Sequence, residues 1–366
     1  MRGLMDRCTL CPRRCGANRN EGEKGACGIA DHLKVAAVNL HPWEEPPISG
    51  SQGSGAIFFS GCSLRCVFCQ NYPISQMGIG RHFTVEGLAR EMLDLQKKGA
   101  HNLNLVTGTQ QIPWVIEALL HAVPRGLSIP LVYNSSGYEC LEVIRLLEGI
   151  VDIYLPDIKY ADPAAASFCS MREDYVRVNR RALLEMWKQV GELRCDSEGV
   201  AVRGMLVRHL VLPGDLSGTR DCLYFLSTRM GPSVWVSLMN QYFPAYLAMG
   251  MPPLDRKVSL EEYEEAEACL EEFGLVRGFV QERCEDEWWT ESADGRLVHS
   301  TFSSMAGRSN RKGRSRLPNR ADTKPRFYFP RDRFPGRGES RAPGKKTRLS
   351  ALRKGLLVRH GKGKDG

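Results

Sequence analysis

Three closely spaced cysteines bear most directly on the chemistry of this sequence. Cys62, Cys66 and Cys69 lie in GCSLRCVFCQN with C-x3-C-x2-C spacing, just after the apolar run AIFFS. Three thiolates on one loop can hold a [4Fe–4S] cluster and leave its fourth iron open to a chelating ligand. Phe68, inside the loop, is expected to shield such a cluster. A zinc knuckle normally recruits a fourth ligand at close spacing, and none follows here. Three unrelated core cysteines are the plainer alternative.

A second set of cysteines precedes the first. Cys8, Cys11, Cys15 and Cys27 have C-x2-C-x3-C-x11-C spacing in a Gly- and Arg-rich segment with few apolar residues. Four thiolates from such a segment suit a closed zinc site or an auxiliary four-ligand [4Fe–4S] cluster, and the spacing does not choose between them. Unliganded cysteines are the alternative. The chain has 13 cysteines, and in a reducing compartment this enrichment points to metal or redox chemistry more than to disulfides.

Alternating apolar runs indicate the fold that must position these cysteines. Strands are expected at residues 56–60, 102–106, 129–134, 151–156, 204–214 and 233–240. Helices are expected between and after them, at 84–98, 112–123 and 140–149, within 174–191, near 219–229 and at 259–273. This alternation predicts an α/β fold with a parallel sheet covered by helices. Right-handed crossovers would curl the six units into a partial (β/α)6 barrel, and a flat doubly wound sheet is the alternative. In both, the site is expected at the carboxyl ends of the strands.

Polar residues follow the second and third expected strands. Thr107, Gly108 and Thr109 end the second strand, and Asn134 and Ser135 end the third. Because the carboxyl ends of parallel strands meet at one edge of a sheet, these residues are candidates for the site. A plain strand-to-helix turn is the alternative for the segment 107–109.

Charged residues lie on the fourth and fifth expected strands. Period-2 alternation puts Asp157 and Lys159 on one face, whereas Arg208 and His209 face opposite sides. An Asp beside a bound carboxylate needs a compensating cation, which Lys159 or a monovalent metal ion would supply. A strand-end ion pair is the alternative. We expect His209 to be a hydrogen-bonded core residue.

The chain divides into three parts by composition. Residues 1–50 are predicted to be a Cys-rich metal-binding module and linker with little periodicity, so regular elements are expected to start near Ala56. Residues 51–285 are predicted to form the partial barrel. Residues 286–366 are predicted to be a linker and a basic, disordered tail, because few apolar residues remain to offset chain entropy.

The net charge of +8 arises in the tail. Residues 301–366 hold 20 Lys and Arg against 4 Asp and Glu, whereas residues 1–300 hold 30 against 38. A nucleic-acid partner is therefore indicated only if the tail is functional. No apolar run approaches the ~18 residues of a membrane span, and MRGLMDRC lacks a secretory signal. We therefore expect a cytoplasmic protein without a membrane partner.

The cysteine motif resembles that of radical S-adenosylmethionine (SAM) enzymes, more narrowly the pyruvate formate-lyase activating enzyme-related group. The resemblance covers about residues 6–285, through CTLCPRRCG, GSGAIFFSGCSLRCVFCQNYPIS, GAHNLNLVTGT, IPLVYNSSGYE, VDIYLPDIKY, RHLVLPG and MNQY. It implies a partial (β/α)6 barrel whose open iron binds the amino and carboxylate groups of SAM. One electron from the cluster would release methionine and a 5′-deoxyadenosyl radical, which abstracts hydrogen from the substrate.

The resemblance also implies roles for single residues. Thr107, Gly108 and Thr109 stand where the superfamily has a Gly-Gly-Glu-like turn that holds the methionine amino group. The carboxylate is missing here, so its role would pass to hydroxyls and carbonyls or elsewhere. The remaining residues implied to contact SAM are Phe68 near the adenine, and Asn134, Ser135, Asp157, Lys159 and Arg208.

At the level of function, the resemblance implies an oxidoreductase that activates a glycyl-radical enzyme and takes electrons from flavodoxin or ferredoxin. Radical SAM modification of RNA or of a small metabolite is one alternative, and the basic tail motivates the RNA option. A non-catalytic iron–sulfur electron-transfer protein is another, because the clustered cysteines alone would permit it.

Overall fold

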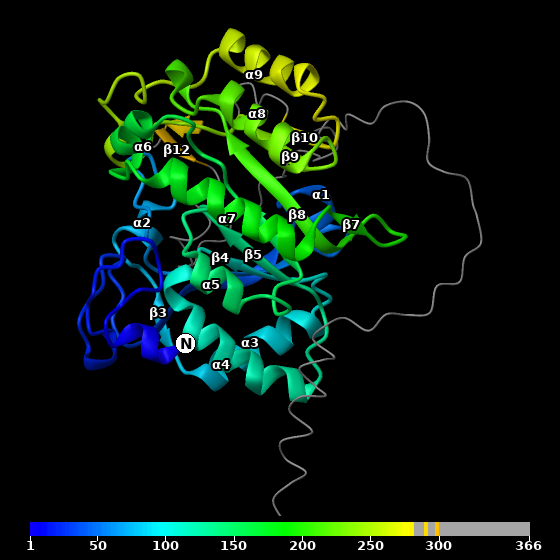
Figure 1. Cartoon of the computed structure of the whole chain (residues 1–366). Coiled ribbons are helices and arrows are strands. Elements are labelled where there is room, and N and C mark those ends of the chain that lie inside the picture. The colour runs from blue at the N-terminus through cyan, green and yellow to red at the C-terminus, as the bar shows by residue number, and fades with distance from the viewer. Residues whose placement is uncertain (282–288, 292–296, 300–366) are drawn as a thin grey trace, which may run out of the picture.

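The computed structural model describes residues 1–281, 289–291 and 297–299, which form an α/β fold (Figure 1). The strands are β1 (Leu33–His41), β2 (Ser54–Phe59), β3 (Arg81–Phe83), β4 (Leu103–Val106), β5 (Leu131–Ser135), β6 (Ile153–Pro156), β7 (Arg194–Cys195), β8 (Ala201–Leu210), β9 (Trp235–Met239), β10 (Gly278–Val280), β11 (Trp289–Glu291) and β12 (Leu297–His299).

Helices connect most of the strands. The α-helices are α1 (Pro46–Ser49), α2 (Tyr72–Ser75), α3 (Val85–Lys97), α4 (Ile112–Ala122), α5 (Leu141–Leu146), α6 (Pro163–Ser170), α7 (Tyr175–Val190), α8 (Thr219–Met230) and α9 (Leu260–Glu272). Short 3-10 turns are η1 (Arg2–Met5), η2 (Arg19–Glu21), η3 (Thr109–Gln111), η4 (Val123–Arg125), η5 (Pro213–Asp215) and η6 (Tyr246–Ala248).

The large sheet is open and mostly parallel. Its strand order is β10-β9-β8-β6-β5-β4-β2-β1-β3, and β7 pairs with β8 at the side. The strands expected from the sequence (β2, β4, β5, β6, β8 and β9) pair in parallel and follow chain order. A doubly wound sheet would reverse that order at a switch point, and these six strands do not. The α/β prediction is confirmed, and the arrangement is compatible with a partial radical SAM barrel.

One expectation was wrong: regular structure starts well before Ala56. Strand β1 pairs antiparallel with β2 on one side and with β3 on the other, so residues 33–41 belong to the large sheet. Most of β1 is only half-buried, and its apolar residues do not alternate strictly with polar ones. The period-2 signal of a strand is therefore weak, and pairing with β2 supplies the stability that the local pattern lacks.

Helix ends follow local signals that were readable in the sequence. Thr84 precedes α3, and its hydroxyl accepts a hydrogen bond from the backbone N–H of Gly87 at 2.9 Å. Ser259 and Glu262 form a reciprocal capping box at the start of α9. Such caps satisfy backbone donors that the first helical turn leaves free.

Successive side chains along the parallel strands point to opposite faces of the large sheet, and each face has its own apolar core. One face packs against α3, α4, α7 and α8, with strand residues such as Leu105, Tyr133 and Val207. The other face holds Val132 and Leu206 together with further apolar side chains. Ile48 of α1, fully buried, packs in this second core, and Figure 1 shows α1 beside β8. The segment after β1 therefore fills the inner face of the curved sheet.

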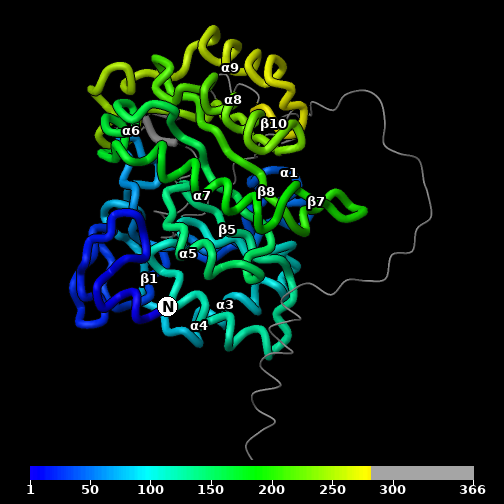
Figure 2. Tube along the Cα trace, viewed as in Figure 1, coloured from blue at the N-terminus to red at the C-terminus, as the bar shows by residue number. Residues whose placement is uncertain are grey.

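The N-terminal segment, dark blue in Figures 1 and 2, lies beside α2 and β3. The metal-binding role of residues 1–50 stays a prediction. The predicted tail at 286–366, apart from β11 and β12, lies outside the described residues. Within the described part of the chain, no helix combines the length and hydropathy that a membrane span requires.

Candidate active site

The three cysteines of the C-x3-C-x2-C motif lie on a loop that leaves the carboxyl end of β2, here named the cysteine loop (residues 61–71). Gly61 starts the loop with φ at +81°, and Arg65 has φ at +63° directly before Cys66. The Val67 backbone donates to the Cys169 carbonyl at 2.8 Å and accepts from the Leu247 N–H at 3.0 Å. These contacts fasten the loop to α6 on one side and to η6 on the other.

Hydroxyl groups contact two of the three thiols. Ser170 Oγ donates to Cys66 Sγ at 3.1 Å, and Tyr160 supports that serine with an O–O distance of 2.7 Å. Ser75 Oγ lies 3.1 Å from Cys69 Sγ. Hydrogen bonds to cysteine sulfur are one of the means by which a protein sets the potential of an iron–sulfur cluster.

The chemistry of the three thiols fits an iron–sulfur cluster. Burial, followed by the neighbouring Cys66 thiol, raises the pKa of Cys62 to about 12. The same two causes raise the pKa of Cys69. Free thiolates are therefore disfavoured at this place, and coordination to cationic iron would provide the opposite charge that stabilises them.

Cys169 is a further cysteine near this loop. Burial, followed by the charge of Cys66, raises the pKa of Cys169 to about 12, so the two thiols are near neighbours. Its side chain on α6 is fully buried in an apolar cluster that also contains Val67 and Phe68. We therefore assign Cys169 to this apolar core and not to the proposed cluster ligands, and Cys169→Ala can test the assignment.

Four of the predicted residues meet at the carboxyl ends of β5, β6 and β8. Lys159 Nζ lies 2.6 Å from Asp157 Oδ2, and Arg208 Nε lies 3.0 Å from Asp157 Oδ1. Arg208 Nη2 donates to Asn134 Oδ1 at 2.6 Å. Asp157 and Arg208 also bridge through their backbones, so the register of the strands creates the contact. We name these four side chains the strand-end cluster.

The electrostatics of the strand-end cluster favour its ionised form. Burial opposes the charge on Asp157, but Lys159 and Arg208 overcome that effect and hold the pKa of Asp157 below its ordinary value. Burial likewise opposes the charge on Lys159, and Asp157 followed by Cys66 raises its pKa. Tyr160, the residue after Lys159, lies with its hydroxyl 3.9 Å from Cys66 Sγ, so the strand-end cluster adjoins the cysteine loop.

Sequence reasoning missed two acidic residues that face Arg208. Glu44 Oε2 lies 3.5 Å from Arg208 Nη1, and Glu44 Oε1 accepts from Asn104 Nδ2 at 3.0 Å. Burial raises the pKa of Glu44, and it raises the pKa of Glu45 to about 7. Both residues lie between Trp43 and a Pro-Pro pair, in a stretch that was interpreted as a connection. Two adjacent carboxylates in that stretch were the available signal.

The side chains of the turn at 107–109 do not contact the strand-end cluster. Thr109 Oγ1 donates to the buried carboxylate of Glu139 at 2.6 Å, and Tyr133 OH lies 3.3 Å from the same hydroxyl. Thr107 adopts φ at +56°, and its backbone N–H donates to the Asn134 carbonyl at 2.9 Å. Gly108 directly follows this strained residue.

Ser135 and Phe68 also lie outside the strand-end cluster. Ser135 is buried, and its hydroxyl accepts from the backbone N–H of Gly137 at 3.0 Å. Phe68 is buried in the cysteine loop and meets Tyr242 edge to face, with ring centroids 5.7 Å apart.

His209 is the core residue that the sequence predicted. Its Nδ1 lies 2.7 Å from the Ile158 carbonyl oxygen and its Nε2 lies 3.0 Å from Thr219 Oγ1. Burial lowers the pKa of His209 to about 4. The ring is therefore neutral at physiological pH, with both nitrogens occupied.

The four N-terminal cysteines, here named the N-terminal quartet (Cys8, Cys11, Cys15 and Cys27), also come together. Three are buried and Cys15 is exposed. The charges of Cys27 and Cys8 act on Cys11, and those of Cys8 and Cys15 act on Cys27. Across the described residues, no three or more His, Cys, Asp and Glu side chains already stand at the spacing of a metal site.

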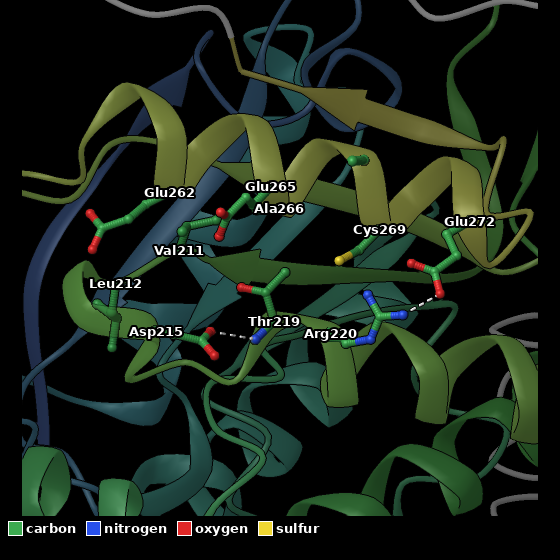
Figure 3. A pocket seen from close by; sticks show the side chains of 11 residues that line it. Val211, Leu212, Asp215, Thr219, Arg220, Glu262, Glu265, Ala266, Cys269 and Glu272 are labelled. Atoms are coloured by element: carbon green, nitrogen blue, oxygen red, sulfur yellow. Dashed lines mark hydrogen bonds and ion pairs between the residues drawn. The ribbon is translucent and has the colours of Figure 1, made fainter.

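A groove between α8 and α9 lies apart from both cysteine sets. Figure 3 shows its charged side chains, among them the Arg220–Glu272 ion pair. Its lining residues are Val211, Leu212, Asp215, Thr219, Arg220, Glu262, Glu265, Ala266, Ala268, Cys269 and Glu272. None of the residues singled out from the sequence as a ligand or SAM contact lines this groove.

The sequence is similar to those of known proteins. The sequence profile of the Radical SAM superfamily matches residues 56–215. The chain is 30% identical over 281 residues to the uncharacterized protein MJ0674 of Methanocaldococcus jannaschii, covering 75% of this chain and 77% of that protein. It is 31% identical over 83 residues to the uncharacterized protein MJ0808 of the same organism, covering 19% of this chain and 24% of that protein.

A solved structure with a similar arrangement is that of HydG, a maturase of the [FeFe]-hydrogenase. The two share 12% sequence identity with a TM-score of 0.42. The similar region covers 61% of this chain and 50% of the HydG chain.

Proposed function

The chain belongs to the radical SAM superfamily, and from this membership we propose that the cysteine loop holds a [4Fe–4S] cluster beside bound SAM. The superfamily implies both cofactors. Together they supply, when bound, a 5′-deoxyadenosyl radical that abstracts hydrogen from a substrate.

One observation carries the proposal: one buried and two partly buried thiols adjoin a strand-end cluster that contains a lysine. The charge of Lys159 acts on Cys69, and the charge of Cys66 acts on Lys159. A ligand that bridges the two places would need an anionic or chelating end near the thiols and polar groups near the strand ends. The amino acid moiety and the ribose of SAM have this character.

The strand-end cluster supplies the polar contacts in this proposal. Lys159 Nζ donates to Asp157 and has two further N–H groups for a carboxylate. Lys159 is also the cation that Asp157 requires, so we assign that charge to Lys159 and not to a monovalent metal ion. Arg208 holds Asp157 and Asn134 in place through two hydrogen bonds. Arg208 itself is a proposed contact to SAM.

The remaining predicted contacts use backbone and apolar groups. Backbone carbonyls of the segment 107–109 are the proposed acceptors for the amino group, because Thr109 Oγ1 is committed to Glu139. Ser135 contributes through its backbone, since its hydroxyl is bonded to Gly137. Phe68 packs near the adenine and keeps water from the thiols.

For the substrate we propose a protein, in the manner of a pyruvate formate-lyase activating enzyme. Tyr72 and Tyr246 stack at 5.1 Å between centroids and so join the end of the cysteine loop to η6. Exposed apolar side chains lie in the two joined segments, at Met77, Ile79, Leu247 and Met249. Apolar side chains exposed beside a site support a macromolecular partner. Electrons would come from flavodoxin or ferredoxin, and a metal at the N-terminal quartet belongs to this proposal.

Production of 5′-deoxyadenosine tests the cofactor chemistry. Anaerobically reconstituted protein should convert SAM to 5′-deoxyadenosine with dithionite, and Cys66→Ala should lower the yield to that of an enzyme-free reaction. Cys169→Ala is the matched control, because Cys169 is the buried neighbour of Cys66 and should retain the activity. Equal turnover by the Cys66 variant, or loss of turnover in the Cys169 variant, contradicts the three-ligand assignment.

Deuterium transfer tests the substrate class. An extract of cells grown on α-deuterated glycine should yield 5′-deoxyadenosine that carries deuterium, because hydrogen is taken from a glycine α-carbon. Protease treatment of the extract should abolish the transfer, and ribonuclease treatment should not. Transfer that persists after proteolysis would replace the protein substrate by RNA or a small metabolite.

A further inference from the structure

Arg19 is fully buried in the N-terminal segment without a carboxylate partner among the described residues. Its guanidinium donates to the carbonyl oxygens of Ala30 and Gln110 at 3.1 and 2.9 Å. It lies 5.2 Å from the ring centroid of Trp114. A buried charge without an opposite charge is costly. The position of Arg19 therefore calls for an anionic group nearby.

The N-terminal quartet is the group next to this arginine. Arg19 Nη1 lies 3.9 Å from Cys8 Sγ, and the charge of Arg19 also acts on Cys15 and Cys27. Four thiolates on one Zn²⁺ carry a net charge of −2, because four negative charges meet two positive ones. A metal-loaded quartet would supply the opposite charge that the buried arginine lacks.

The chain geometry brings two of the sulfurs to one place. A Cβ atom on Gly25 would make ordinary van der Waals contact with both Cys27 Sγ, at 3.4 Å, and Cys15 Sγ, at 3.5 Å. Cys15 is exposed and is followed by Gly16, whose φ is +71°. Gly16 thus lets the chain turn directly after Cys15, and the exposed Cys15 side chain has room to close on an ion.

The backbone pairing of Cys8 with the residues after Cys15 favours one ion over a cluster. The Gly16 N–H donates to the Cys8 carbonyl at 3.2 Å and the Cys8 N–H donates to the Ala17 carbonyl at 3.0 Å, which brings Cys8 and Cys15 side by side. A tetrahedral Zn²⁺ with Zn–S bonds of about 2.3 Å places its sulfurs just under about 4 Å apart. The thiolates of a [4Fe–4S] cluster bind four separate irons and stand farther apart.

From these observations we propose that the N-terminal quartet binds one structural Zn²⁺, and that this ion holds the cysteine loop in place. Each coordinating thiol releases its proton to solvent when the ion binds. The zinc site rests on the quartet and on Arg19 alone. Its effect on a [4Fe–4S] cluster rests on the proposed function of the cysteine loop.

Reciprocal hydrogen bonds join the quartet segment to the cysteine loop. Arg13, between Cys11 and Cys15, donates to the Ser63 carbonyl oxygen and to that of Leu64, the latter at 3.2 Å. In the other direction, Arg65 Nη1 donates to the carbonyl oxygen of Ala26 at 3.3 Å. Each segment therefore holds backbone carbonyls of the other, and two of the residues held, Ser63 and Ala26, directly adjoin Cys62 and Cys27.

A second connection runs through buried side chains. Arg19 holds the carbonyl of Gln110, and Gln110 Nε2 lies 3.0 and 2.8 Å from the carbonyl oxygens of Ser60 and Gly61. Gly61 itself abuts the Cys27 carbonyl, which a Cβ atom at that position would meet at 2.6 Å. Loss of the metal would release the segment that these contacts hold, and with it the start of the cysteine loop.

Metal analysis tests the zinc site independently of SAM chemistry. The full chain with C62A, C66A and C69A should retain one zinc per chain and no iron. Adding Cys15→Ser should remove the zinc, whereas adding Cys195→Ser, another exposed cysteine, should not. Iron in place of zinc in the triple variant, or zinc unchanged by Cys15→Ser, overturns the proposal whether or not the protein cleaves SAM.

Iron content tests the coupling. In the otherwise natural chain, Arg13→Gln should keep the zinc but lower the iron incorporated on reconstitution by several-fold. Arg14→Gln, whose exposed guanidinium pairs with Glu142 at 2.8 Å, should leave both metals at their natural levels. Full iron incorporation by the Arg13 variant, or by zinc-free Cys15→Ser protein, would show that the quartet does not hold the loop.

Discussion

Arg208 and His209 are neighbours on one strand, yet they occupy two different environments. Arg208 faces the inner side of the curved sheet, where Asp157, Asn134 and Glu44 surround its guanidinium. His209 faces the helices and is fully buried, with one partner for each ring nitrogen. Pairing on the inner side keeps Asp157 and Lys159 charged, although burial raises the pKa of Glu44 and Glu45 there. The outer environment keeps its histidine neutral.

The difference shows how polar residues in a strand separate into functional and structural ones. On the helix-covered side, burial lowers the pKa of His209 and raises that of Glu139 to about 7, so both groups are driven toward neutrality. On the inner side, mutual pairing prevails over burial for Asp157 and Lys159. Charges retained at strand ends are available to a ligand, and neutral groups with satisfied hydrogen bonds are not.

Replacing Arg208 should have the largest effect on stability. Arg208→Met leaves Asp157 and Glu44 buried with less opposite charge, and breaking a buried ion pair in this way costs about 3–5 kcal/mol. Urea unfolding under anaerobic conditions measures the loss. The same variant should bind SAM more weakly, which would be seen by calorimetry.

Arg220→Met is the control for this substitution. Arg220 pairs with Glu272 on the surface, with more than half of its side chain exposed, and solvent screens such pairs. We expect no resolvable change in the urea midpoint or in SAM binding. A similar loss in both variants would mean that the inner environment has no special role.

His209→Gln should change the pH dependence of stability and leave SAM binding intact. In the unfolded chain a histidine takes up its proton near pH 6.5, whereas burial lowers the pKa of His209 to about 4 in the folded chain. The stability due to the neutral ring is therefore complete above about pH 6.5 and is lost as the pH falls toward 4, by up to about 3 kcal/mol. The glutamine variant should have a flatter profile over that interval, measured by urea unfolding at several pH values.

The exposed His121 offers a control, since His121→Gln should leave the profile unchanged. A profile that is equally steep in the His209 variant would show that another group causes the acid sensitivity.

Thr109→Val should have the smallest effect of the three. It removes the hydrogen bond to the buried Glu139 and leaves that carboxyl with Tyr133, which costs about 1–2 kcal/mol. SAM binding should be unchanged, because the hydroxyl belongs to the helix-covered side. A large fall in SAM affinity would move Thr109 into the binding site and contradict the division between the two sides.

The strands and their order were predictable from the sequence because each parallel strand is a short apolar run. The meeting of Asp157 with Lys159 followed from period-2 alternation, and the interior position of Arg208 followed from the opposite placement of His209. These are local rules, and the structure agrees with them because successive side chains of a strand always point to opposite faces of the sheet.

What the sequence could not predict depends on contacts between distant segments. Strand β1 lacks strict alternation and is held by pairing with β2 and β3. Glu44 reaches Arg208 only because the segment after β1 folds onto the inner face. The link from Arg13 to the cysteine loop joins residues about 50 positions apart, and no local pattern carries such information.

The response of the reduced cluster to SAM tests the central claim most directly. In dithionite-reduced protein, an electron paramagnetic resonance signal that shifts on addition of SAM, and is absent from Cys66→Ala, is the result expected for an iron with an open coordination position. A signal that is identical with and without SAM would contradict the account, because it would mean that four protein ligands close the cluster.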